Sequence, residues 1–185
     1  MSVSWLISSV ILGKCIVNYG AKAVILISNA ILLISTILLP TLGISSSLLL
    51  VLLYVFIMGF GFGGAFTTLT IIVQESVEYN KRGTATATNS LLRTLGQTIG
   101  VSVFGSIFNL YIIKYFINIG IEGVDPSNLY KASAYNDVVT NEQIRLSLNS
   151  SLHVLFIILI IISILSLVLS VLMPRIVSRS KTTEV

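Results

Sequence analysis

The sequence contains apolar runs that are too long and too free of charge for a water-soluble fold. From Ala23 to Gln74 there are 52 consecutive residues without a charged side chain, and from Thr94 to Ile113 there are another 20. The stretch from Leu146 to Pro174 carries one ionisable group, His153. About 20 apolar helical residues cross the roughly 30 Å hydrocarbon layer of a bilayer, so each run predicts at least one membrane-spanning helix.

Composition and charge agree with this interpretation. Hydrophobic residues make up 55% of the chain and charged residues 10%, whereas a soluble domain has about a quarter charged residues. The apolar runs are continuous rather than alternating, which favours helices over a transmembrane β-barrel. The basic residues flank the runs, so the positive-inside rule explains the basic balance better than nucleic-acid binding does. We therefore predict an all-α integral membrane protein whose main partner is the lipid bilayer.

Turn signals divide the chain into five predicted spans that form a single membrane region over residues 1–185. Pro40 and Gly43 end the second span, and Pro174 ends the last one. A polar outer loop is expected over 120–150, with 137–148 a candidate for a short helix on the membrane surface. Residues 174–185 are expected to form a basic tail. The predicted spans are about 3–19, 23–39, 48–73, 86–114 and 152–173.

The basic residues also predict the orientation of the spans. With five spans, the turns at 14–22 and 75–83 and the tail fall on one side, which then holds seven Lys and Arg residues against three on the other. Arg93 is left out of this count. Because Lys and Arg concentrate on the cytoplasmic side, we expect the C-terminus inside the cell membrane and the N-terminus outside. The seven are Lys14, Lys22, Lys81, Arg82, Arg175, Arg179 and Lys181, and the three are Lys114, Lys131 and Arg145.

Glycines crowd the centre of the third predicted span. The string from Gly59 to Gly64 matches G-x-G-x-x-G, the spacing of dinucleotide-binding loops. That site needs a strand before the glycines and a helix that begins at them, whereas these glycines lie inside one long apolar run. Close helix packing, with Gly59 and Gly63 as a small-xxx-small pair, is the favoured interpretation.

A narrow polar stripe runs along the fourth predicted span. At 3.6 residues per turn its four central residues fall within roughly 60° of one another. An arginine facing lipid is costly, so the stripe is expected to face protein or a water-filled cavity. Arg93 itself either snorkels to the inner interface or lies within the membrane and needs a partner. The central residues are Asn89, Arg93, Gly96 and Gly100, bordered by Thr86 and Gln97.

The spans offer no candidate for an enzyme active site. They contain no Ser/His/Asp, Cys/His or paired-carboxylate arrangement that would support catalysis, and no cluster that predicts a metal or a bound cofactor. One cysteine, Cys15, allows no internal disulfide.

Several motifs together resemble the late C-terminal half of the major facilitator superfamily, most closely its fourteen-span branch of drug:proton antiporters. In that branch a glutamine ends one span, an R-G-x-A-T-A turn follows, and an R-x-x-G-x-x-x-G helix comes next. The chain has Gln74, then the turn from Arg82 and Gly83 to Ala87, then the helix from Arg93 to Gly105. The glycine-rich third span matches the span that precedes this turn. The segment Gly13-Lys14 to Gly20-Ala-Lys22 is similar to the cytosolic loop G-x-x-x-D-R-x-G-R, with Asn18 in place of the acidic residue.

The resemblance implies that the chain forms most of the C-terminal half of a proton-coupled multidrug efflux transporter. It implies a proton gradient as the driving force, and small hydrophobic or cationic drug-like substrates. It also implies that the chain begins within or just before the second helix of that half, and that a missing N-terminal half is needed for activity. The alternatives are an orphan truncated fragment without transport activity, or a packing and assembly module.

Residue roles follow from the same resemblance. They are transport-cavity candidates (Arg93, Asn89, Gln97 and Gln74), helix-packing glycines (Gly59, Gly63, Gly96, Gly100 and Gly105), and the cytosolic loop motif (Gly13, Lys14, Gly20, Lys22, Arg82 and Gly83).

Overall fold

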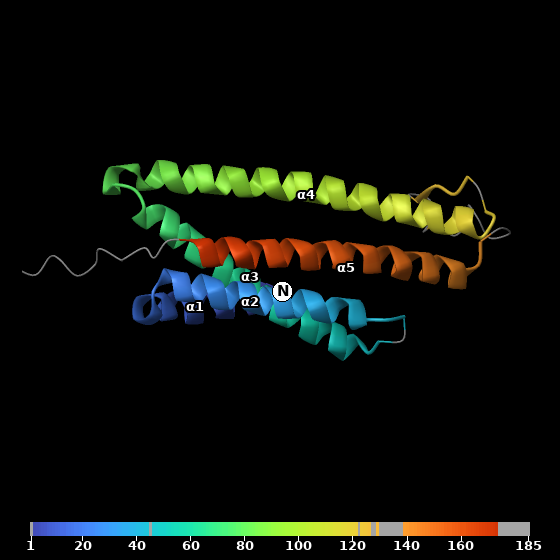
Figure 1. Cartoon of the computed structure of the whole chain (residues 1–185), viewed down its shortest axis with the longest axis horizontal. Helices are drawn as coiled ribbons and strands as arrows, with labels where there is room; N and C mark the ends of the chain where they lie inside the picture. The colour runs from blue at the N-terminus through green and yellow to red at the C-terminus, as the bar shows by residue number, and fades with distance from the viewer. Residues whose placement is uncertain (1, 45, 122, 127–128, 130–138, 174–185) are drawn as a thin grey trace, which may run out of the picture.

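The structure is a computed structural model that describes residues 2–44, 46–121, 123–126, 129 and 139–173. Within this part the chain forms five long helices (Figure 1), each long and apolar enough to cross a membrane. The protein is therefore an all-α, multi-pass membrane protein. Two short 3-10 helices, η1 (Leu39–Thr41) and η2 (Tyr79–Lys81), lie in the turns. The long helices are α1 (Ser2–Tyr19), α2 (Ala21–Leu38), α3 (Leu48–Glu75), α4 (Arg82–Asn118) and α5 (Asn141–Leu172).

Successive helices run in opposite directions along the bundle (Figure 1). The α1–α2 turn, the α3–α4 turn and the last turn of α5 meet at one end, where Lys22 Nζ donates a 2.9 Å hydrogen bond to the carbonyl of Val171. At the other end, His153 Nε2 lies 3.0 Å from the carbonyl oxygen of Pro40 in η1. The two turns with basic residues therefore share one end of the bundle, as their predicted common side requires.

The first turn is a single residue. The predicted first span, about 3–19, agrees with α1, so most of the basic segment 14–22 that was counted as a turn is helical, and α2 begins at Ala21. Gly20 alone reverses the chain, with a φ of 82° that residues with a Cβ rarely adopt. A single glycine is therefore enough to join two antiparallel helices here.

The last helix begins earlier than predicted. Residues 141–150 belong to α5 and not to an outer loop, and the predicted separate helix over 137–148 does not exist from Asn141 onward. Residues 130–138 lie outside the described part. Thr140 and Gln143 form a reciprocal capping box that begins α5. At 1.5 Å per residue, α5 is about 48 Å long and α4 about 55 Å, so both exceed the apolar layer.

The close contacts of α3 with α1 depend on small side chains. Ser4 and Ser8 of α1 are buried and donate hydrogen bonds to the carbonyls of Phe56 and Phe60 on α3. A Cβ added to Gly63 would lie 2.8 Å from the carbonyl oxygen of Trp5. The helix α3 is continuous from Gly59 to Gly64, so the strand and loop of a dinucleotide site are not present there.

The helix α4 is held at its two ends and lies open between them. Its C-terminal end joins an apolar cluster with the start of α5, centred on Ile112 and Phe116. Its N-terminal end is tied to the end of α3. Between these anchors, each residue from Leu91 to Ile99 is exposed. Among the residues that the structure describes, the middle of this membrane-length helix therefore has no tightly packed neighbour.

Candidate functional site

Gln74 connects the two helices that carry the predicted site. Its side-chain Nε2 donates a 3.0 Å hydrogen bond to Oγ1 of Thr86, whose own hydroxyl donates to the carbonyl of Arg82 at 2.8 Å. This chain of bonds joins the last turn of α3 to the first turns of α4. Gln74 is half-buried, and its observed contact fixes how the two helices meet.

Arg93 faces α3. Its guanidinium carbon lies 5.4 Å from the ring centroid of Phe66, within the range of a cation–π contact. Phe66 precedes Glu75, the one charged residue of α3 and its last residue, by nine residues, or about 13 Å of helix. Arg93 is therefore level with the apolar part of α3 and not with its charged end. This position favours the interpretation in which Arg93 lies within the membrane and needs a partner.

The ring below Arg93 belongs to an aromatic cluster, defined here as Trp5, Phe62 and Phe66. The Trp5 ring from α1 stacks on the Phe66 ring with centroids 5.2 Å apart. The Phe62 ring also stacks on the Phe66 ring, with centroids 5.7 Å apart. Arg93 remains exposed and makes no ion pair with any described carboxylate. The cluster thus contacts the Arg93 guanidinium, and no described carboxylate neutralises the charge of that group.

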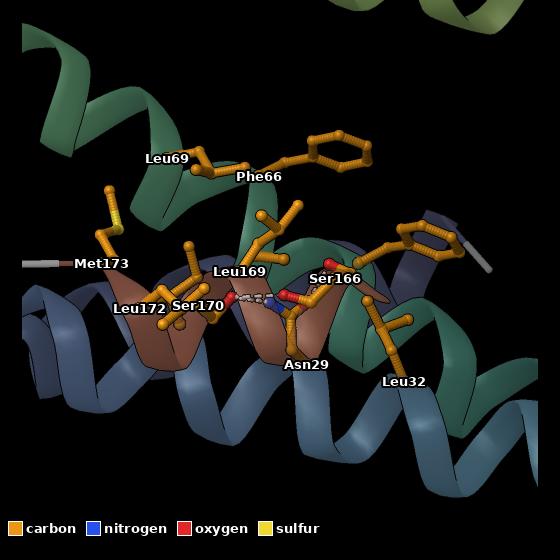
Figure 2. A pocket seen from close by; sticks show the side chains of 12 residues that line it. Asn29, Leu32, Phe66, Leu69, Ser166, Leu169, Ser170, Leu172 and Met173 are labelled. Carbon is orange, nitrogen blue, oxygen red and sulfur yellow. Dashed lines mark hydrogen bonds between the residues drawn. The ribbon is translucent and has the colours of Figure 1, made fainter. Parts of the chain in front are cut away.

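A cavity of about 490 Å³ opens between α2, α3 and α5, and Phe62 and Phe66 form part of its wall (Figure 2). Its polar side is an amide and hydroxyl network. Asn29 Nδ2 donates to Ser170 Oγ, Ser166 Oγ donates to Asn29 Oδ1 at 3.3 Å, and Ser170 Oγ donates to the Ser166 carbonyl at 2.9 Å. The remaining lining is mostly apolar, so the cavity suits an amphipathic molecule.

The serines of this network lie on the side of α5 that faces α2. On the same side, Ser163 shares a 2.8 Å hydrogen bond with Thr36, which follows Asn29 by seven residues, or about two turns of α2. Asn29 is buried at 5% exposure and was missed by the sequence reasoning. Asn29 is the one asparagine among these 52 uncharged residues, whose other amide, Gln74, is the last of them, and this was the signal that would have identified it.

The remaining stripe residues make few contacts within the described part of the chain. Asn89 is half-buried and lines a second cavity of about 490 Å³ where the end of α3 meets the start of α4, whereas Gln97 is exposed. A Cβ added to Gly96, Gly100 or Gly105 would meet no described atom within 4 Å. Their role in helix packing stays a prediction that requires a neighbour from outside these residues.

The residues of the loop motif lie on α1, at the α1–α2 turn and at the α3–α4 turn. Lys22 binds the carbonyl of Val171, where a cation complements the negative end of the α5 dipole. Lys14 is exposed on α1, and Arg82 lies 5.4 Å over the ring of Tyr79. Gly13 and Gly83 have open space where a Cβ would be. Among the described residues, no three His, Cys, Asp or Glu side chains come together to hold a metal.

The fold and this site define a multi-pass helical membrane protein with a polar wall, a name used here for the open middle of α4 together with the cavity between α2, α3 and α5. Residues 1–117 match the family described as the Major Facilitator Superfamily, and the chain belongs to that superfamily. It is similar to the multidrug transporter protein MdtP of Bacillus subtilis strain 168, with 29% identity over 109 residues, or 59% of this chain and 20% of that protein. It is also similar to multidrug resistance protein 3 of the same strain, with 28% identity over 175 residues.

The second match covers 85% of this chain and 34% of the relative, so the chain spans about a third or less of the length of these two proteins. No solved structure matches the chain.

Proposed function

We propose that the chain supplies part of the cavity wall of a proton-coupled multidrug efflux transporter in the cell membrane. The observation that carries the proposal is the open middle of α4, where Arg93 contacts Phe66, a residue that lines the amphipathic cavity between α2, α3 and α5. A polar wall of this kind is costly against lipid and useful against a solvated substrate path. Membership of the superfamily and the names of the two relatives support the same conclusion.

The proposed orientation places the α1–α2 and α3–α4 turns in the cytoplasm, with the N-terminus outside and the C-terminus inside. The support is the excess of Lys and Arg at these turns and in the tail. In this orientation Arg93 lies in the inner part of the membrane, and His153 lies near the outer surface.

Transport by this wall requires further helices. Alternating access needs one bundle of helices to rock against another around a central site, and the described helices leave α4 open. The apolar parts of the five spans also carry no Asp or Glu that would hold a transported proton. We propose that an N-terminal half supplies both the second bundle and the proton carriers, and that residues 1–185 alone give no efflux. The substrates proposed from the resemblance are small hydrophobic or cationic drug-like molecules.

Co-expression tests this proposal. Residues 1–185 are produced in an efflux-deficient host, alone and together with the N-terminal half of multidrug resistance protein 3, and dye extrusion is measured before and after collapse of the proton gradient. The two halves of that relative, expressed separately, are the positive control. We expect gradient-dependent extrusion only when both halves are present. Extrusion by residues 1–185 alone would contradict the proposal, as would no extrusion from the mixed pair while the control pair works.

A matched pair of variants links the activity to the wall. Arg93→Gln removes the cation over Phe66, whereas Lys114→Gln removes a cation that lies 5.8 Å over Tyr111 near the other end of the same helix. We expect the first to reduce extrusion by the mixed pair and the second to leave it unchanged. If Arg93→Gln and Arg93→Lys both extrude normally, Arg93 is an interface anchor with no role in transport.

A further inference from the structure

The central part of the described wall carries positive charge and no negative charge. Arg93 is the one charged residue between Arg82 and Lys114 on α4, and α3 carries none before Glu75. No described carboxylate pairs with Arg93, and its side chain is exposed. In the membrane position proposed above, where the surroundings screen charge poorly, an unpaired guanidinium attracts an anion much more strongly than it would in water.

Geometry adds a second requirement to the charge. Phe66 holds the guanidinium by its ring face and is itself stacked with Trp5 and Phe62. Aromatic rings favour other aromatic rings as neighbours, and a planar guanidinium binds a carboxylate or sulfonate through two parallel hydrogen bonds. A ligand with an aromatic body and an anionic group would satisfy both halves of this arrangement at once.

The adjoining cavity provides room for the apolar body. Phe62 and Phe66 line it together with Leu69, and its volume of about 490 Å³ is within the range of small-molecule sites. At its polar side, Asn29 uses one of its two Nδ2 hydrogens for Ser170. The polar network therefore has hydrogen-bonding capacity beyond the bonds that join α2 to α5.

We infer that this surface, formed by Arg93, the aromatic cluster and the adjoining cavity, binds amphipathic aromatic anions. The inference rests on the proposed function and specifies the substrate class for the wall that this chain contributes. Its anionic group differs from the hydrophobic or cationic drug-like molecules that the family resemblance implies, because the charge in the central part of the wall, within the described residues, is positive. Arg93 binds the anionic group, and the rings of Trp5, Phe62 and Phe66 contact the aromatic body.

The single tryptophan of the chain reports binding directly, since Trp5 is part of the cluster. Residues 1–185 are placed in lipid discs of zwitterionic composition and titrated with dansylglycine, an aromatic carboxylate that accepts energy from tryptophan. The matched probe is dansylcadaverine, which has the same chromophore and a positive charge. We expect dansylglycine to bind about tenfold more tightly or better, since a hydrogen-bonded charge pair is worth that factor. Equal affinity for the two probes, or tighter binding of the cation, overturns the inference.

Variants then assign the selectivity to Arg93. Arg93→Gln is expected to remove the preference for the anion, and Arg93→Lys to keep part of it, because the charge remains but the planar fork is lost. Lys114→Gln is the matched control and should keep the full preference. Helical content and the emission of Trp5 without ligand verify that each variant is folded. A preference that survives Arg93→Gln in a folded protein refutes the assignment, and the comparison of the two probes on the unaltered chain needs no variant at all.

Failure of this inference is distinguishable from failure of the proposed function. Binding in discs needs neither a proton gradient nor a second bundle of helices. Selective anion binding without extrusion by the mixed pair would contradict the proposed function alone. Extrusion of cationic dyes together with equal binding of the two dansyl probes would contradict the substrate class alone.

Discussion

The contact between α1 and α3 leads to a sharp prediction at Gly63. A Cβ added there would lie 2.8 Å from the carbonyl oxygen of Trp5 and 3.0 Å from Cβ of Ser8. The nearest atom belongs to the backbone of a helix, so no rotamer change removes the clash. Gly63→Ala must therefore move α1 away from α3 by several tenths of an ångström. The hydrogen bond from Ser8 to the Phe60 carbonyl crosses the same contact and would lengthen with it.

A matched glycine separates this steric effect from helix propensity. Gly96 lies inside α4, and a Cβ added to it would meet no described atom within 4 Å. Both substitutions gain the same propensity, about 0.5–1 kcal/mol for Ala over Gly inside a helix. Overpacking a well-packed contact costs about 1–3 kcal/mol. The difference in unfolding free energy between Gly63→Ala and Gly96→Ala is thus expected to be about 1–3 kcal/mol, with Gly96→Ala the more stable.

Unfolding in mixed micelles with increasing dodecyl sulfate measures this difference. Circular dichroism follows the helices, and the emission of Trp5, which stacks on Phe66, follows the contact of α1 with α3. Gly63→Ala should lose the Trp5 signal at lower detergent fraction than Gly96→Ala. Equal unfolding midpoints for the two variants would refute the reasoning, since the clash at Trp5 would then be relieved without a free-energy cost.

Three further outcomes are expected. Thr68→Val should raise the unfolding free energy by up to about 1 kcal/mol, because the buried Thr68 hydroxyl has no hydrogen-bond partner among the described residues; a loss would show that this hydroxyl is bonded. Asn29→Leu should lower it by about 1 kcal/mol through loss of the bond to Ser170, and no change would mean that the network does not stabilise the bundle. In a cysteine-free background, Ser47→Cys should react with an impermeant reagent outside intact cells and Tyr79→Cys should not; the reverse would invert the proposed orientation.

The number and limits of the helices were largely accessible from the sequence. The first three predicted spans begin or end within two residues of α1, α2 and α3, because uncharged runs and turn residues such as Pro40 determine both features. The start of α5 was not accessible from hydropathy. The first turns of α5 are polar, so a rule based on apolar runs assigned them to a loop, whereas the capping box at Thr140 and Gln143 begins the helix there.

The candidate site was only partly accessible, because its geometry depends on contacts between helices distant in sequence. A single-helix pattern left open whether Arg93 snorkels or lies within the membrane and needs a partner, and it could not identify Phe66 as the ring that Arg93 contacts. The hydrogen bonds from the serines of α5 to Asn29 and Thr36 on α2 depend on the packing of α2 on α5, which no single-helix pattern contains. Periodicity indicates which face of a helix differs from the others, and packing decides what that face meets.

The hydroxyl groups along the open middle of α4 explain how such a face is tolerated in a membrane. Four of them each donate to the carbonyl oxygen four residues earlier, so they need neither water nor a neighbouring helix as a partner. The exposed side chains of Arg93 and Gln97 make no such hydrogen bond to the backbone of their own helix, so these two groups require polar surroundings. A helix with this division is suited to a wall that meets water in one conformation and protein in another, because only a few side chains must exchange partners. The four hydroxyls belong to Thr94, Thr98, Ser102 and Ser106.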